Sequence, residues 1–193
     1  MACDFLACSA YKFYGPHIGV LWGRHALIDA LDLPKLDPAP SESPENLETG
    51  TQNHEGIIGA GAAVDWLANL TTDPASRRDG LATTFAELHA RGVQLFRTLH
   101  DGLKAISGVE LYGLPPDGPR TPTIAFRVAG KSCDDVAVAF AERGLFVSHG
   151  DFYAATVIER LGVASDGVVR VGCSAYTTGE EIERALDAVK GLA

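Results

Sequence analysis

The sequence predicts a mixed α/β chain built from two parts, an α/β segment over residues 1–80 and an α+β domain over residues 81–193. Two short apolar runs lie close together near the start, which is typical of neighbouring strands. A polar stretch over residues 70–80 separates the two parts. Beyond it, helical and strand patterns alternate as far as the C-terminus, which indicates an α+β domain.

The first part is predicted to contain two strands, a long loop and one helix. The apolar runs at residues 3–8 and 17–22 predict strands that flank a tight Gly-Pro turn. Residues 33–44 are rich in Pro, Asp and Ser and predict a surface loop. A polar turn then leads into a helix over residues 55–70.

The second part begins with the longest predicted helix, residues 81–106, whose apolar side chains recur on one face. The elements expected after it are, in order, strand 109–112, strand 123–128, helix 133–143, strand 145–148, helix 154–161, strand 168–173 and a C-terminal helix. Ser132 is expected to cap the helix that follows it, and Thr178 with Glu181 has the spacing of a capping box.

Lys12 is the charged residue whose position most needs an explanation. It stands between an apolar strand and a tight turn, whereas the other four lysines lie in polar or helical settings. Burial of an ammonium there is costly and lowers its pKa, which is what Schiff-base chemistry requires of a lysine. The alternative is a lysine at a strand end that extends its ammonium to water over Phe13 and Tyr14.

Two further segments carry polar residues in settings that suggest binding. Gly50 and Thr51 precede a predicted helix, where backbone amides and a hydroxyl can hold an anion, although a plain helix cap has a similar composition. Arg170 interrupts a β-branched run, and its planar guanidinium is suited to bidentate binding of a carboxylate. The alternative for Arg170 is an arginine on an exposed strand face.

These segments together resemble the class V aminotransferase and cysteine desulfurase-like family of pyridoxal-phosphate enzymes, which have fold type I. Three motifs carry the resemblance, namely Ser9-x-x-Lys12 followed by Phe-Tyr-Gly-Pro, Glu48-Thr-Gly50-Thr51, and Arg170-x-Gly-x-x-x-Tyr176-x-Thr178. The resemblance implies that the chain is the C-terminal portion of such an enzyme. Residues 1–80 are then the remnant of the PLP-binding large domain, and residues 81–193 are the small α+β C-terminal domain.

The resemblance also implies roles for individual residues. In this family the lysine forms a Schiff base with pyridoxal 5'-phosphate, which gives that catalytic role to Lys12, and the serine corresponding to Ser9 holds the cofactor phosphate. Tyr11 stands where the family often has a phosphate-binding His, and its phenol can also donate a hydrogen bond. Gly50 and Thr51 correspond to residues that reach the phosphate bound in the partner subunit, which implies a homodimer.

Arg170 corresponds to the arginine that holds the α-carboxylate of a small amino-acid substrate.

One departure from the family concerns desulfurase chemistry. Tyr153 stands where desulfurases carry their nucleophilic cysteine, and a phenol cannot attack sulfur as a thiolate does. The chain has four cysteines, which match no zinc spacing and are expected to be small buried hydrophobes: Cys3, Cys8, Cys133 and Cys173. Transamination, which needs no extra nucleophile, is therefore preferred to sulfur abstraction.

In this family a large part of the cofactor domain precedes the lysine. We expect that part to be absent from this chain, because Lys12 is only the twelfth residue. We expect the chain to be incomplete as a cofactor site, whether as a truncation or as one chain of a split enzyme. The alternative function is a non-catalytic fragment that dimerises or binds a partner through surface that the missing half normally covers.

The composition is that expected of a globular cytoplasmic protein. Of its 193 residues, 46% are hydrophobic and 21% are charged, which suits a packed core and not a disordered chain. The net charge of -9 argues against nucleic acid and anionic membranes as partners. We expect no membrane span and no signal peptide, because no apolar run is long enough and no basic segment opens the chain. Four cysteines without a framework spacing are typical of a reducing compartment.

Overall fold

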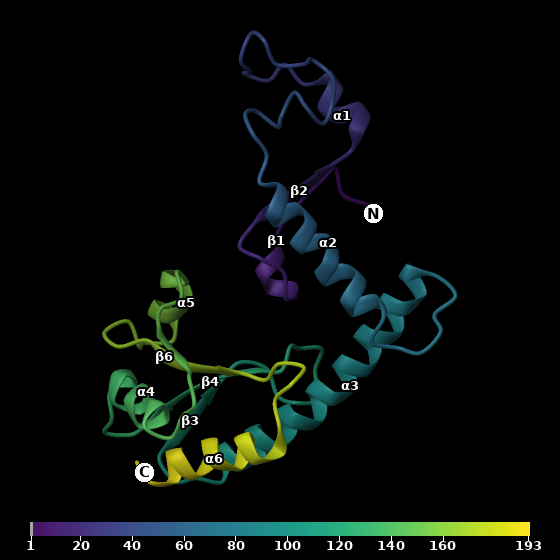
Figure 1. Ribbon diagram of the computed structural model, residues 1–193. Coiled ribbons are helices and arrows are strands. Elements are labelled where there is room, and N and C mark those ends of the chain that lie inside the picture. The colour runs from purple at the N-terminus through teal and green to yellow at the C-terminus, as the bar shows by residue number, and fades with distance from the viewer. Residues whose placement is uncertain (1) are drawn as a thin grey trace. The chain divides into compact units, whose positions relative to one another are not determined.

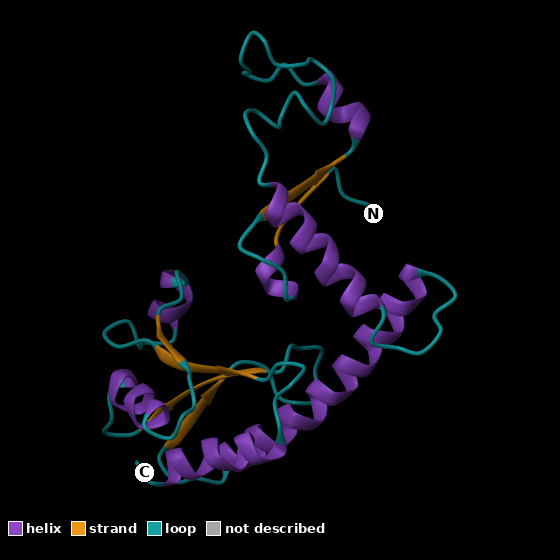
Figure 2. Ribbon diagram, viewed as in Figure 1, coloured by secondary structure: helices purple, strands orange, loops and turns teal. Residues whose placement is uncertain are grey.

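The structure is a computed structural model that describes residues 2–193 (Figures 1 and 2). The chain divides into two compact units, of which the first ends at Thr84 and the second is Phe85–Ala193. The boundary between them lies inside helix α3 (Arg77–Lys104). No helix among the described residues has the length and apolar character that a membrane crossing requires.

The first unit is organised around an antiparallel pair of strands, β1 (Phe5–Ser9) and β2 (Gly19–Gly23), in which Ser9 pairs with Gly19. A 3-10 helix, η1 (Ala10–Phe13), begins directly after β1 and forms part of the connection to β2. Lys12 lies in η1, so the predicted turn between the two strands contains one helical turn.

Helix α2 (His54–Ala68) packs against the η1 connection. The Asn53 side chain caps this helix by accepting a hydrogen bond from the Gly56 N–H at 2.9 Å. Tyr14 meets Trp66 edge-to-face, with ring centroids 5.6 Å apart. The short helix α1 (His25–Ala30) follows β2.

Consecutive apolar side chains of β1 and β2 remain exposed. The exposed fractions reach 45% for Leu6 and 58% for Leu21. We call this set the β1–β2 apolar surface, and its members are Phe5, Leu6, Val20, Leu21 and Trp22.

The second unit is an antiparallel four-stranded sheet with helices. The strands lie in the order β3 (Val109–Tyr112), β4 (Thr123–Val128), β6 (Val168–Gly172) and β5 (Ser148–Gly150). Its helices, besides the C-terminal part of α3, are α4 (Cys133–Ala141), α5 (Ala155–Arg160) and α6 (Gly179–Lys190). Figure 1 shows α4 and α6 with the sheet in this unit. The α+β character predicted for this part is therefore observed.

The core of the second unit lies between one face of the sheet and the helices. Along β4 the side chains alternate, so that Ile124, Phe126 and Val128 are buried. They pack in one cluster with apolar residues of α3, α4, β6 and α6. Gly102 of α3 lies directly against Leu186 of α6, where any larger residue would collide with the leucine side chain.

The strand expected at residues 145–148 is wrong in position, because β5 begins only at Ser148. Gly144 has a left-handed φ of 68°, and the Leu145 N–H donates to the Phe140 carbonyl oxygen at 3.0 Å, as is typical of a helix end. Leu145 and Val147 pack against the core without pairing in the sheet. The apolar residues Leu145 and Val147 therefore reflect packing against the core and not a strand.

The start of one helix and the presence of two short helices also differ from expectation. Helix α3 begins at Arg77 and not at residue 81, because Ser76 caps it: the Asp79 N–H donates to the Ser76 Oγ at 3.2 Å. The elements η1 and α1 were not expected at all, and neither has a side-chain cap at its start that could have marked it in the sequence. Strands β3 and β4 have the predicted bounds.

Candidate functional site

The turn that carries Lys12 is closed by small residues and backbone hydrogen bonds. The Ala10 N–H donates to the Ile18 carbonyl oxygen, and the Gly15 N–H donates to the Ala10 carbonyl oxygen, both at 2.9 Å. Ala10 is fully buried, and a Cβ at Gly15 would lie 3.0 Å from the Ala10 Cβ. Tyr14 has a left-handed φ of 67° at the end of η1. These contacts fix the backbone that presents Lys12.

The Lys12 side chain is exposed, so the expectation that burial tunes it is wrong for this chain. The reason is that the neighbouring apolar strands, which would have to cover it, are themselves exposed. The Lys12 Nζ lies 5.8 Å from the centroid of the Tyr11 ring, and Tyr11 stacks on His17 at a centroid distance of 5.1 Å. Within residues 2–193 the ammonium has no carboxylate partner.

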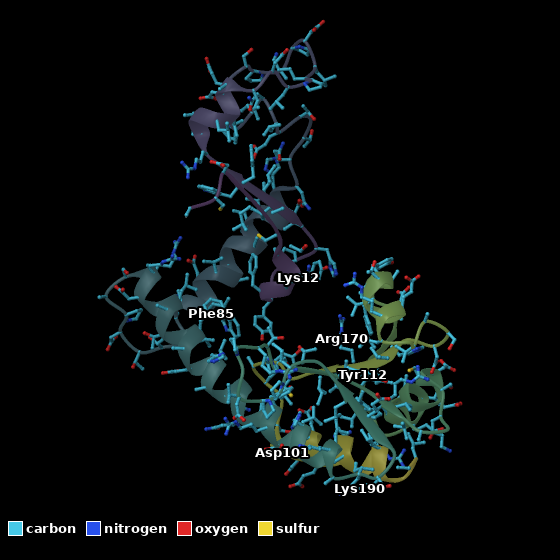
Figure 3. All side chains as sticks on the ribbon, turned by 180° about the vertical axis from the view of Figure 1, so that it is seen from behind. Lys12, Phe85, Asp101, Tyr112, Arg170 and Lys190 are labelled. Carbon is cyan, nitrogen blue, oxygen red and sulfur yellow. The ribbon has the colours of Figure 1, made fainter. Side chains whose placement is uncertain are left out.

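Ser9 and Tyr11 lie on the same short segment as Lys12. Ser9 ends β1 and stands at the start of η1, where its side chain makes no capping hydrogen bond. The serine hydroxyl and the lysine amine are therefore available to a ligand on this segment. Figure 3 labels Lys12 in this unit.

Gly50 and Thr51 lie in the same unit, in the turn before α2. Gly50 has a φ of 77°, a left-handed conformation that favours glycine, and Thr51 is exposed. Asn53 and not Thr51 caps α2, which leaves the threonine hydroxyl without a capping role.

Arg170 belongs to the second unit, at the centre of its sheet (Figure 3). In the strand register it pairs with Ala125 of β4 on one side and with Ser148 of β5 on the other. Its neighbour Val169 is fully buried, whereas Arg170 is exposed on the opposite face. No carboxylate among the described residues pairs with its guanidinium, so all of the guanidinium N–H donors remain open to a ligand.

The loop after β5 supplies a neighbour of Arg170 that the sequence reasoning missed. The Arg170 Cζ lies 4.0 Å from the centroid of the Phe152 ring. Tyr153, which the sequence comparison above expects at the position of the desulfurase cysteine, is fully exposed in this loop. No pattern in the sequence marks Phe152, because the contact depends on the pairing of β5 with β6 and on the shape of the loop.

The cysteines differ in their surroundings. Cys133 is buried, and burial together with the nearby Asp166 carboxylate raises the pKa of its thiol to about 11. Burial also raises the pKa of Cys173. Cys8 is exposed on β1, so the expectation of a buried small hydrophobe is wrong for this residue, again because the strand is uncovered.

Comparisons with known proteins identify the family. The family described as Aminotransferase class-V matches residues 1–185. A probable cysteine desulfurase of Pseudomonas aeruginosa is 32% identical over 196 residues, covering 95% of this chain and 44% of that protein. The chain belongs to the class-V aminotransferase family. The cysteine desulfurase CsdA of Escherichia coli is 31% identical over 202 residues, covering 96% of this chain and 45% of CsdA.

Solved structures of the family agree with the predicted fold class. The apo structure of a cysteine desulfurase from Thermococcus onnurineus NA1 matches with a TM-score of 0.82 at 26% identity, over 98% of this chain and 46% of that one. The crystal structure of CsdA in its S-sulfonic acid form matches with a TM-score of 0.78 at 28% identity, over 97% of this chain and 45% of that one. The chain thus spans about half the length of the class-V relatives it matches, and the resemblance and fold class read from its sequence are confirmed.

Class-V aminotransferases and cysteine desulfurases are PLP-dependent enzymes, and this chain has side chains that fit the cofactor. PLP requires a primary amine and hydrogen-bond donors for its phosphate. Lys12 offers an unpaired amine, and the Ser9 hydroxyl lies on the same segment without a capping role. The donor set of the β1–η1 segment is therefore chemically suited to the group.

Proposed function

We propose that this chain contributes the cofactor lysine and the substrate-binding arginine of a PLP-dependent enzyme that acts on an amino acid. The observation that carries the proposal is the unpaired amine of Lys12, held by the closed turn between β1 and β2 in a member of the class-V aminotransferase family. When bound, PLP supplies the electron-withdrawing ring that loosens the bonds at the amino-acid Cα.

Each named side chain has a task that its local setting supports. Lys12 would hold the cofactor through its primary amine and would move a proton at the substrate Cα. Ser9 and the Tyr11 phenol donate hydrogen bonds to the phosphate. Arg170 holds the substrate carboxylate through its open N–H fork.

Gly50 and Thr51 are proposed to serve the phosphate bound in a second copy of the chain. The exposed Thr51 hydroxyl and the left-handed Gly50 make the turn before α2 a free donor site. The functional form would then be a homodimer. The four cysteines form no disulfide within residues 2–193, which suits a cytoplasmic location.

The reaction branch is proposed to be transamination and not sulfur abstraction. Tyr153 occupies the loop position that we align with the nucleophilic cysteine of desulfurases, and its phenol is not a substitute for a thiolate. Cys133 and Cys173 are ill suited to replace it, because burial raises the pKa of both thiols.

The chain alone is proposed to be an incomplete cofactor site. After mixing with excess PLP and removal of the unbound cofactor on a desalting column, we expect much less than one PLP per chain, measured by absorbance after release in alkali. The reason is that a single amine and a few hydroxyls on an exposed segment leave the ring unenclosed. Retention of one PLP per chain through the column would contradict incompleteness but would agree with the role of Lys12.

A second candidate function is a non-catalytic module that dimerises or binds a partner. The β1–β2 apolar surface favours it, because large apolar side chains left exposed on one pair of strands commonly mark an interaction site. The unpaired outer edges of a two-stranded sheet have the same tendency.

Sedimentation velocity tests this second candidate. We expect the unaltered chain to self-associate with rising concentration and Leu21→Lys to reduce that association, because the substitution places a charge in the β1–β2 apolar surface. Leu36→Lys is the matched control, since Leu36 is equally exposed at 62% but lies in a loop outside this surface. Equal association of both variants would exclude the surface as the interface.

A further inference from the structure

One large side chain, that of Phe152, lies next to the guanidinium of Arg170. Its partners across the sheet, Ala125 and Ser148, are both small, so neither covers the guanidinium plane. Phe152 lies against that plane instead, with the Arg170 Cζ 4.0 Å from the ring centroid. Phe152 is half-buried, whereas its neighbour Tyr153 is fully exposed.

The backbone that places Phe152 is held in an uncommon conformation. Phe152 has a φ of 55° and Tyr153 a φ of 58°, and two successive left-handed residues with bulky side chains are rare outside constrained sites. Asp151 holds the loop in place. Its Oδ1 accepts from the Tyr153 N–H at 3.0 Å, and its carbonyl oxygen accepts from the Ala154 N–H at 2.9 Å.

A ring stacked on a guanidinium restricts it without using its hydrogen bonds. The face of the guanidinium interacts with the π-system, while the N–H groups in the guanidinium plane remain free for a carboxylate. Bidentate binding needs that plane to be held in one orientation, because both N–H donors must meet both oxygens together. A Leu at position 152 would offer apolar bulk without the π-face.

We propose that Phe152 is a positioning residue for Arg170, which orients the guanidinium so that its in-plane edge receives the carboxylate of an amino-acid substrate. The proposal rests on the assignment of Arg170 in the proposed function. It goes beyond that assignment by giving the loop between β5 and α5 a task in substrate binding that does not depend on a cysteine.

Nuclear magnetic resonance of the full chain tests the proposal with alanine as the probe. The readout is the Arg170 Nε–H signal during titration with alanine, which reports both the ring current of residue 152 and carboxylate binding. We expect Phe152→Leu to move this signal before alanine is added and to weaken alanine binding about two- to fivefold, the range that an exposed cation–π contact provides. We expect Phe152→Tyr to restore both properties.

Phe146→Leu is the matched control, because Phe146 is a nearly fully exposed phenylalanine in the segment before β5. It should change neither the Arg170 signal nor the alanine affinity. If Phe152→Leu does not fold, as judged by circular dichroism, Phe152→Met takes its place, because the flexible methionine side chain adapts to irregular packing better than leucine does.

The possible outcomes separate the two claims. If Phe152→Leu leaves the alanine affinity unchanged while Arg170→Lys weakens it, the positioning role is overturned and the Arg170 assignment stands. If Arg170→Lys has no effect on the alanine titration, or if the unaltered chain shows no alanine-dependent change at Arg170, the Arg170 assignment fails and the positioning role fails with it.

Discussion

Replacement of Lys12 by alanine is expected to reduce any PLP-dependent turnover of an amino acid by this protein to background. The proton-transfer role of a catalytic lysine alone contributes on the order of 10²–10⁴-fold to the rate. Loss of the amine also removes the covalent attachment of the cofactor, and the nearest lysine in the sequence, Lys35, lies in a separate loop. The measurement is the rate of amino-acid consumption with and without added PLP.

Two further variants define the cause of the loss. Lys12→Arg keeps the positive charge but removes the nucleophilic amine, so it should be as inactive as Lys12→Ala. Lys131→Ala removes a lysine of the second unit that is also exposed and should leave the rate unchanged. PLP-dependent turnover that persists in Lys12→Arg would show that Lys12 acts through its charge and would refute the covalent role.

Replacement of Asp166 by alanine is expected to lower the free energy of unfolding of the second unit by about 2–3 kcal/mol. The Asp166 Oδ2 accepts from the Arg127 Nη2 at 3.0 Å, and both carboxylate oxygens accept from the Cys133 N–H at the start of α4. The alanine variant leaves the Arg127 guanidinium partly buried without its carboxylate and removes an acceptor from a helix start. Denaturant unfolding followed by circular dichroism measures the change.

The Arg97–Asp117 pair provides the matched control for Asp166. It has an N–O distance of 2.7 Å, shorter than that of Arg127 and Asp166, but both of its side chains are more than half exposed. Because water screens an exposed pair, Asp117→Ala should cost less than about 1 kcal/mol. Equal effects of Asp117→Ala and Asp166→Ala would mean that partial burial of the Arg127–Asp166 pair carries no extra stability.

The double variant Asp166→Ala with Arg127→Met separates the pair from the orphaned charge. If most of the loss in Asp166→Ala comes from an unpaired guanidinium, removing that guanidinium as well should recover part of the stability. A double variant that is as unstable as the sum of the two single variants would assign the loss to two independent contacts.

The fold of the second unit could be predicted well where the sequence pattern is local. Strands β3 and β4 follow from short runs of apolar and β-branched residues, and helix α6 follows from a capping box at Thr178 and Glu181, which the structure contains. The position of β5 could not be predicted in this way, because Leu145 and Val147 have the composition of a strand but are used for packing against the core.

The setting of Lys12 shows a different limit of sequence reasoning. The apolar runs on either side of Lys12 predicted that its side chain is buried. Such runs imply burial only where another part of the molecule covers them. In this chain Leu6 and Leu21 are exposed, and Lys12 is exposed with them. The proposal that Lys12 is the cofactor lysine rests on local sequence, whereas the exposure of Lys12 depends on contacts that the local sequence does not contain.

The neighbours of Arg170 illustrate the same point at the scale of a loop. An arginine within a β-branched run could be singled out from the sequence, and it proved to be exposed on a central strand. Its contact with Phe152 could not be predicted, because it requires the β5–β6 register and two successive left-handed residues.

The central claim is that Lys12 is the cofactor lysine, and reductive trapping tests it most directly. The chain is mixed with PLP, reduced with borohydride, digested, and mapped by mass spectrometry, with Lys131→Ala and Lys12→Ala treated in parallel. We predict that the pyridoxyl group is found at Lys12 in preference to the other four lysines and that Lys12→Ala loses this labelling. Equal labelling of all exposed lysines, or preferential labelling elsewhere, would contradict the claim.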